Sequence, residues 1–238
     1  MMWQFGIKKR DLTNLVQEAR KACEDLRELR CADRLDNSFD TSYTATDISG
    51  SYYVSIAGGD NVAMISNAHT REDGGSNWSN RVTDGTTVNM DWDYDALKAA
   101  HRTAALIKGP QGIKMNINLD TFVCSKGYST HHRAMEMLGS FRKGWQPSTA
   151  DREGAGVPDY NIIALPWITT NTGYWWMFDS SMKGPKYGLQ FKEAQGIKLE
   201  GPNIVFRTGE IQYKALTIFD LGFNDARGWV GSKATNAA

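Results

Sequence analysis

The sequence has few cysteines and prolines and no long apolar segment. It holds three Cys and six Pro among 238 residues. Cys23, Cys31 and Cys124 are odd in number, widely spaced and without a Cys-x-x-Cys pair. This pattern predicts neither a disulfide framework nor a zinc site, and we expect reduced thiols packed as small apolar side chains. No run approaches 18 consecutive apolar residues, and residues 1–10 lack the features of a signal peptide, so we expect no membrane partner.

The sequence also lacks an excess of charge of either sign. Lys and Arg number 27, Asp and Glu number 27, and the formal net charge is zero. A generic nucleic-acid binder, which holds phosphates through a basic face, is therefore not predicted. Neutral surfaces tend to associate, and the eight Trp and nine Phe are residues that fill cores and anchor interfaces. The composition thus favours a globular protein that assembles.

Motifs for catalysis and for cofactor binding are missing. The sequence contains no Gly-x-Ser-x-Gly elbow and no Gly-x-x-x-x-Gly-Lys-Ser/Thr loop. The nearest glycine motif, Gly154-Ala155-Gly156, precedes a proline at 158 instead of a helix. Asp151 and Glu153 lie in a polar loop, where a solvated pair is favoured over a general acid and base. We therefore predict no enzyme, no catalytic residue and no cofactor.

Two patterns resemble metal sites, and both fail. Residues 91–95 read Asp-Trp-Asp-Tyr-Asp, as at the start of a calcium loop, but Ala96 and Arg102 occupy the positions that need Gly and Glu. His131 and His132 are adjacent, and neighbouring helical residues point about 100° apart. No metal ligand is predicted.

Hydropathy patterns predict an α+β protein. A long helix is expected over 12–36, capped by Asp11 and ~37 Å long, with further helices over 93–107 and from Ser129 to about Leu138. Strands are expected at 1–8, 52–56, 121–124, 160–166, 174–179, 188–192, 203–207 and 210–221. Trp175 and Trp176 lie in an apolar run that indicates a strand buried on both faces. Long polar loops cover 67–89 and 141–158, and Trp78 and Trp145 within them are candidates for contacts with a partner.

The order of several segments resembles major capsid proteins of tailed bacteriophages, of the Hong Kong 97 fold. The segments are LDTFVCS at 119–125, HHRAMEMLG at 131–139, GVPDYNIIALPW at 156–167, WMFDSSMKG at 176–184, RTGEIQYK at 207–214 and FDLGFNDARGW at 219–229. Gly58-Gly59-Asp60, the run 66–70 and Ser79-Asn80-Arg81 resemble the corresponding stretch of Mu-like capsid subunits. The similarity extends over nearly the whole chain.

The resemblance implies a domain plan. Residues 1–10 would be the returning strand of an extended loop, 11–51 a peripheral domain with a long spine helix, 52–202 mainly an axial domain with a central sheet flanked by helices, and 203–238 peripheral strands and the C-terminal tail. Family members carry an N-terminal arm and the outgoing half of the loop before this point, and we expect that the sequence is missing them.

The resemblance also implies a function. The chain would be a virion protein that forms pentamers and hexamers of an icosahedral head, assembled in the host bacterial cytoplasm. Its partners would be copies of itself, scaffold, portal and decoration proteins, and packaged double-stranded DNA bound without sequence specificity. The alternatives are an encapsulin-like cellular shell of the same fold, and a monomeric module that binds carbohydrate or nucleic acid through loop tryptophans. We place candidate interface residues in the long loops: Arg71, Trp78, Arg81, Arg142, Lys143, Trp145 and Arg152.

Overall fold

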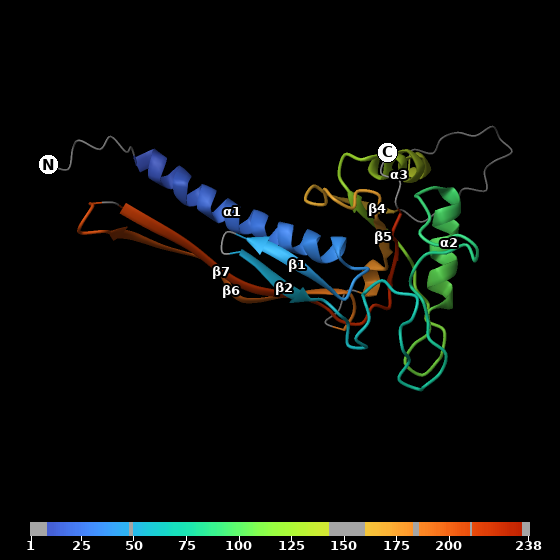
Figure 1. Cartoon of the computed structure of the whole chain (residues 1–238). Helices are drawn as coiled ribbons and strands as arrows, with labels where there is room; N and C mark the ends of the chain where they lie inside the picture. The colour runs from blue at the N-terminus through green and yellow to red at the C-terminus, as the bar shows by residue number, and fades with distance from the viewer. Residues whose placement is uncertain (1–8, 48–49, 143–159, 183–185, 210, 235–238) are drawn as a thin grey trace. The chain divides into compact units, whose positions relative to one another are not determined.

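The computed structural model describes residues 9–47, 50–142, 160–182, 186–209 and 211–234, and these are α+β, as predicted (Figure 1). The helices are α1 (Lys9–Asp36), α2 (Tyr94–Leu106), α3 (Ser129–Arg142) and the 3-10 turn η2 (Ser180–Met182). The strands are β1 (Ser42–Asp47), β2 (Gly50–Ser55), β3 (Thr121–Ser125), β4 (Asn161–Leu165), β5 (Trp175–Phe178), β6 (Leu189–Ile204), β7 (Ile211–Phe223) and β8 (Trp229–Ser232).

The chain divides into two compact units, each built from two separate stretches of sequence. Met1–Cys31 and Phe191–Leu221 form one, which we call the helix–hairpin unit. Ala32–Gln190 and Gly222–Ala238 form the other, the sheet unit. The predicted boundaries differ from this division, because residues 32–51 and 222–238 belong to the sheet unit and residues 191–202 to the helix–hairpin unit. Residues 1–8, predicted as a strand, lie outside the described residues, and positions 9 and 10 already belong to α1.

The long helix is confirmed, with 28 residues. It begins at Lys9, so Asp11 lies inside the first turn instead of capping it. In the helix–hairpin unit α1 runs beside the β6–β7 hairpin (Figure 1). Arg27 joins them: its Nε donates to Thr217 Oγ1 at 3.2 Å, and its guanidinium pairs with the Glu193 carboxylate. The same guanidinium carbon lies 5.7 Å from the ring centroid of Phe191. The half-buried Arg27 side chain therefore holds the helix to the hairpin through an ion pair, a hydrogen bond and a contact with an aromatic ring.

Strand β6 is one 16-residue strand, where two short strands at 188–192 and 203–207 were predicted. Gly201 has φ +136°, and a Cβ there would come within 2.9 Å of the Gln212 carbonyl oxygen on β7. The close cross-strand approach therefore requires a glycine within a continuous strand. In a two-stranded sheet each strand has an unpaired edge, and this is where a proline is tolerated.

The sheet unit is organised by a four-stranded sheet in the order β4-β3-β5-β8. β3 pairs parallel with β4, while the β3–β5 and β5–β8 pairs are antiparallel. Trp175 and Trp176 are both fully buried, as predicted, and the Trp176 indole N–H donates to Ser38 Oγ at 2.9 Å. β8 was not predicted: Gly231 lies opposite Trp176, and a Cβ at 231 would come within 2.9 Å of that ring. Only glycine fits this close packing.

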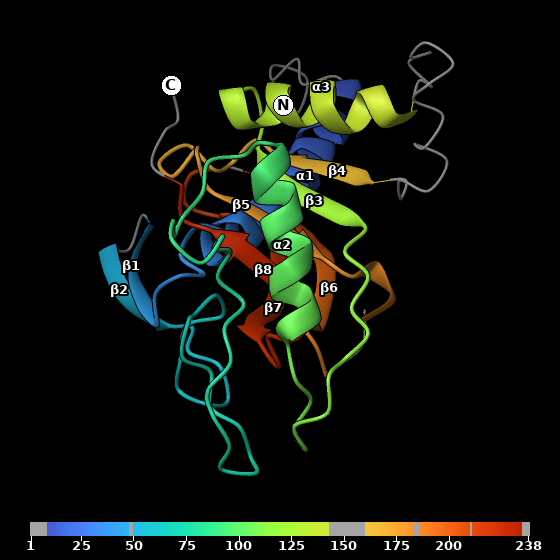
Figure 2. The ribbon, with the colours of Figure 1, turned by 90° about the vertical axis from the view of Figure 1, so that its right-hand side faces the viewer.

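Two helices cover parts of this sheet. α2 contacts β8, and α3 contacts β3 and β4 (Figure 2). Asp93 caps α2 as predicted, because its side chain accepts a hydrogen bond from the Ala96 N–H at 2.7 Å. The small residues Ala96, Ala100 and Ala104 are buried along one side of α2 and let the helix approach closely. β1 and β2 form a separate antiparallel hairpin, of which β1 had been read as a loop.

Candidate functional site

Three of the seven predicted interface residues lie together in the segment between β2 and α2. Arg71, Trp78 and Arg81 belong to this segment, whose structure consists of turns and isolated bridges such as that between His69 and Trp78. Arg142 is the last residue of α3. Lys143, Trp145 and Arg152 lie outside the described residues. The interface role of all seven stays a prediction.

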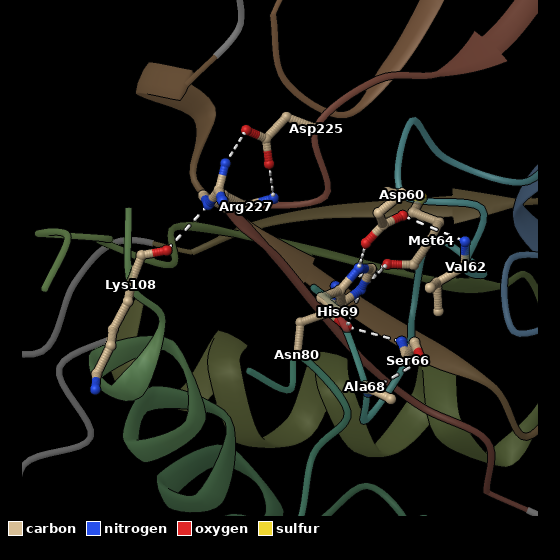
Figure 3. A network of polar contacts seen from close by, with 10 residues as sticks. All are labelled: Asp60, Val62, Met64, Ser66, Ala68, His69, Asn80, Lys108, Asp225 and Arg227. Carbon is tan, nitrogen blue, oxygen red and sulfur yellow. Dashed lines mark hydrogen bonds and ion pairs between the residues drawn. The ribbon is translucent and has the colours of Figure 1, made fainter. Parts of the chain in front are cut away.

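A buried polar network holds this segment in place (Figure 3). His69 Nδ1 lies 2.8 Å from Asp60 Oδ2, and His69 Nε2 lies 3.2 Å from both the Met64 carbonyl oxygen and Asn80 Oδ1. Asn80 Nδ2 donates to the Met64 carbonyl at 2.8 Å, and Asn80 Oδ1 accepts from the Ser66 N–H at 2.8 Å. His69 and Asn80 thus form hydrogen bonds with backbone groups of Met64 and Ser66, which lie outside the regular strands.

Trp78, which the sequence places in a polar loop as a candidate for contact with a partner, is buried within the chain. Its side chain is 7% exposed. The ring stacks on His69, with centroids 4.3 Å apart and planes 18° apart, and the Arg227 guanidinium carbon lies 5.4 Å from its centroid. Arg227 in turn pairs with Asp225, and its Nε donates to the Lys108 carbonyl at 3.0 Å. Trp78 therefore ties the segment to two distant parts of the chain.

The two arginines of the segment have partners within the chain. Arg71 pairs with Asp73, whose pKa is lowered first by the Gly75 backbone N–H and further by Arg71. Arg81 Nε donates to Asn89 Oδ1 at 2.7 Å, and its guanidinium carbon lies 5.8 Å from the Phe39 centroid. These contacts order the loops. The sequence analysis predicted both arginines as interface residues, but it did not predict their partners Asp73 and Asn89.

A cavity of about 400 Å³ lies beside the network. Its lining has the cationic side chains of Arg71, Lys186 and Arg227, and the carboxylates of Asp60, Glu72 and Asp225. The Asp60–His69 pair resembles the orienting half of a catalytic triad, but His69 Nε2 faces two oxygen atoms that already hold it. The arrangement stabilises structure and leaves no nitrogen positioned to accept a proton from a nucleophile. Sequence reasoning missed His69, Asp60 and Arg227, because each contributes only through contacts across the fold.

Other kinds of site are not found among the described residues. They contain no group of three or more His, Cys, Asp and Glu side chains that could hold a metal ion. In the same residues no helix is both long enough and apolar enough to span a membrane. All three cysteines are free, and burial raises the pKa of the Cys124 thiol to about 12.

Comparison with known proteins adds no relative. No protein-family model, no curated protein and no solved structure matches the chain.

Proposed function

We propose that this chain is a major capsid subunit of the Hong Kong 97 type, which assembles into the pentamers and hexamers of a phage head around double-stranded DNA. Assembly would take place in the host bacterial cytoplasm, and the mature location would be the virion. Three features support the proposal: the ordered sequence resemblance, the pairing of a long helix with a long hairpin, and a separate unit built on a central sheet with helices against it.

The observation that carries the proposal is the apolar surface of the β6–β7 hairpin. Phe206, at the turn that follows β6, is 100% exposed, Ile204 is 59% exposed and Ile218 is 48% exposed. Further exposed apolar side chains on these two strands are Phe191, Leu199 and Tyr213. A two-stranded sheet is marginal in water by itself, and a concentration of exposed apolar residues marks an interaction surface.

In a shell, the exposed apolar surface of each hairpin would be covered by a neighbouring subunit. Complete burial of one Phe or Ile side chain contributes about 1.5–3 kcal/mol, which is weak for a single pair of subunits. In a closed ring every subunit makes the contact twice, so modest contacts add up to a stable assembly. The zero net charge is compatible with this, because summed repulsion between many copies is absent.

The test is the mass of the expressed full chain as a function of concentration. The chain mass is 26.5 kDa, so light scattering after size exclusion should reveal species near ~130 and ~160 kDa, for pentamers and hexamers. Electron microscopy should show rings or closed shells. A chain that stays monomeric at millimolar concentration would contradict the proposal.

A pair of variants tests the surface that carries the proposal. Phe206→Ser should weaken assembly at least tenfold, because it removes an apolar contact of more than ~1.4 kcal/mol. Ile113→Ser is the matched control: Ile113 is 71% exposed in a loop of the sheet unit, and its loss should leave the mass distribution unchanged. Equal effects of the two changes would remove the support from the hairpin.

Electron microscopy and a ligand titration separate this proposal from the two alternatives, the encapsulin-like shell and the loop-binding module. Shells that form without nucleic acid and enclose a protein cargo would favour an encapsulin-like compartment. A strict monomer whose tryptophan fluorescence responds saturably to an oligosaccharide or an oligonucleotide would favour the loop-binding module.

A further inference from the structure

A second cavity, of about 370 Å³, has a lining that carries positive charge alone. It lies between the loop residues 76–85 and the C-terminal part of α2. The cationic residues of its lining are Arg81, Arg102 and Lys108, and among the described residues no Asp or Glu lines it. In a chain with equal numbers of acidic and basic residues, this separation of charge is a local property of the fold.

The three cationic residues come from different segments, and the side chains of two of them are anchored. Arg102, on α2, donates through its guanidinium to the Asp84 carbonyl oxygen. Arg81 is held through Nε by Asn89. The backbone of Lys108 is fixed because its carbonyl accepts from Arg227 and because it forms a bridge with Lys114. Anchored charges lose little conformational freedom when a ligand binds.

A buried donor without a partner also belongs to this lining. Trp78, which is more than nine-tenths buried, lines the cavity, and its indole N–H has no hydrogen-bond partner among the described residues. Hydroxyl and amide groups of Ser76, Asn77 and Thr83 also line the cavity.

We propose that this cavity binds the phosphate group of a small molecule. A carboxylate would balance one of the three positive charges. A phosphate group carries about two negative charges at neutral pH, and pyrophosphate carries more. The guanidinium groups of Arg81 and Arg102 match phosphate oxygens through pairs of N–H donors. The volume falls in the range of small-molecule sites. This site uses neither the β6–β7 hairpin nor its exposed apolar residues, which carry the proposed assembly.

The Asp84 carboxylate, in the loop beside the cavity, accepts hydrogen bonds from the backbone. Asp84 Oδ1 accepts from the Thr86 N–H at 2.7 Å and from the Thr87 N–H at 2.6 Å. These backbone bonds lower the pKa of Asp84, with that from Thr87 the largest cause. Asp84 is outside the lining of the cavity, and the Arg102 charge lowers its pKa less than the backbone bonds do, so this carboxylate offsets only part of the positive charge of the lining.

The experiment is calorimetric titration of the full chain with inorganic pyrophosphate at constant ionic strength. We expect saturable binding at one site per chain. Arg102→Gln should raise the dissociation constant about tenfold, because it removes a charge-assisted contact. Lys108→Gln should also raise the dissociation constant. It provides a second test of the cavity in case Arg102→Gln does not fold. Lys98→Gln is the matched control, since Lys98 lies on α2 outside the cavity and pairs with Asp95.

Three results would overturn the proposal. One is the absence of saturable heat up to millimolar pyrophosphate. Another is equal weakening by Arg102→Gln and Lys98→Gln, which would mean nonspecific attraction to positive charge. The third is binding of a single-stranded oligonucleotide when pyrophosphate does not bind, which would assign the residues to a nucleic-acid backbone instead. Particle formation by Arg102→Gln in phosphate-free buffer reports separately on assembly.

Discussion

The Asp60–His69 hydrogen bond allows a quantitative test of what holds the loops between β2 and α2. The bond is 2.8 Å long, and the His69 side chain is 3% exposed while that of Asp60 is 22% exposed. A hydrogen bond to a charged group contributes about 1.5–3 kcal/mol, and a buried donor left unpaired costs about 1–3 kcal/mol. The bond should therefore be visible as an energetic coupling between the two residues.

A double-mutant cycle with Asp60→Ala and His69→Phe measures that coupling. Phe preserves a ring against Trp78, so the contribution of stacking, about 0.5–1.5 kcal/mol, is largely retained and the loss reports on hydrogen bonds. Each single change should lower the free energy of unfolding by about 2–3 kcal/mol. The double variant should lose about 1.5 kcal/mol less than the sum, because neither partner is then left unpaired.

Urea unfolding followed by tryptophan fluorescence is a suitable assay, because Trp92, Trp175 and Trp176 are buried in the sheet unit. His132→Phe, at an exposed position of α3, is the control for the substitution itself and should change the free energy by less than about 0.5 kcal/mol. If the two single effects add within about 0.5 kcal/mol, the network is not cooperative and the reasoning fails.

Three further outcomes follow from the described contacts. Arg27→Met should destabilise the helix–hairpin unit by about 1–3 kcal/mol, which faster hydrogen exchange in β6 and β7 would show. The control Arg20→Met removes only an exposed i,i+4 ion pair with Glu24 and should lower the free energy of unfolding by less than about 0.5 kcal/mol. Burial lowers the pKa of His101, so the imidazole takes up a proton more readily in the unfolded chain than in the folded one. The free energy of unfolding should therefore fall as the pH drops below about 6.5. His101→Asn should make the free energy of unfolding, measured by urea titration, depend less on pH in this range. The Cys124 thiol, with its pKa near 12, should resist iodoacetamide at pH 8 in the folded protein and react after unfolding, as mass spectrometry of the alkylated peptides would show.

Much of the secondary structure could be predicted from local patterns. The apolar spacing over 12–36 marks α1, Asp93 marks the start of α2, and the run that contains Trp175 and Trp176 marks a strand with both faces covered. These predictions are confirmed because helix caps and hydropathy periods report on neighbours a few residues away.

What failed depended on contacts between distant residues. The prediction of two short strands in place of β6 was wrong, because it took no account of the close fit of Gly201 against Gln212 on β7. β8 was missed because it is a strand through the fit of Gly231 against Trp176. Local propensity carries no information about such partners, and a strand is stabilised by the strand beside it.

The sequence by itself determined the class of the protein and several of its limits. The α+β content, the free cysteines and the zero net charge follow from composition and from short-range patterns. The tertiary structure alone decided that Trp78 is buried between His69 and Arg227, and that Arg81, Arg102 and Lys108 line one cavity without an acid. The physical reason is distance along the chain: Trp78 lies 9 residues from His69 and 149 from Arg227, Arg81 lies 27 residues from Lys108, and only folding brings these groups together.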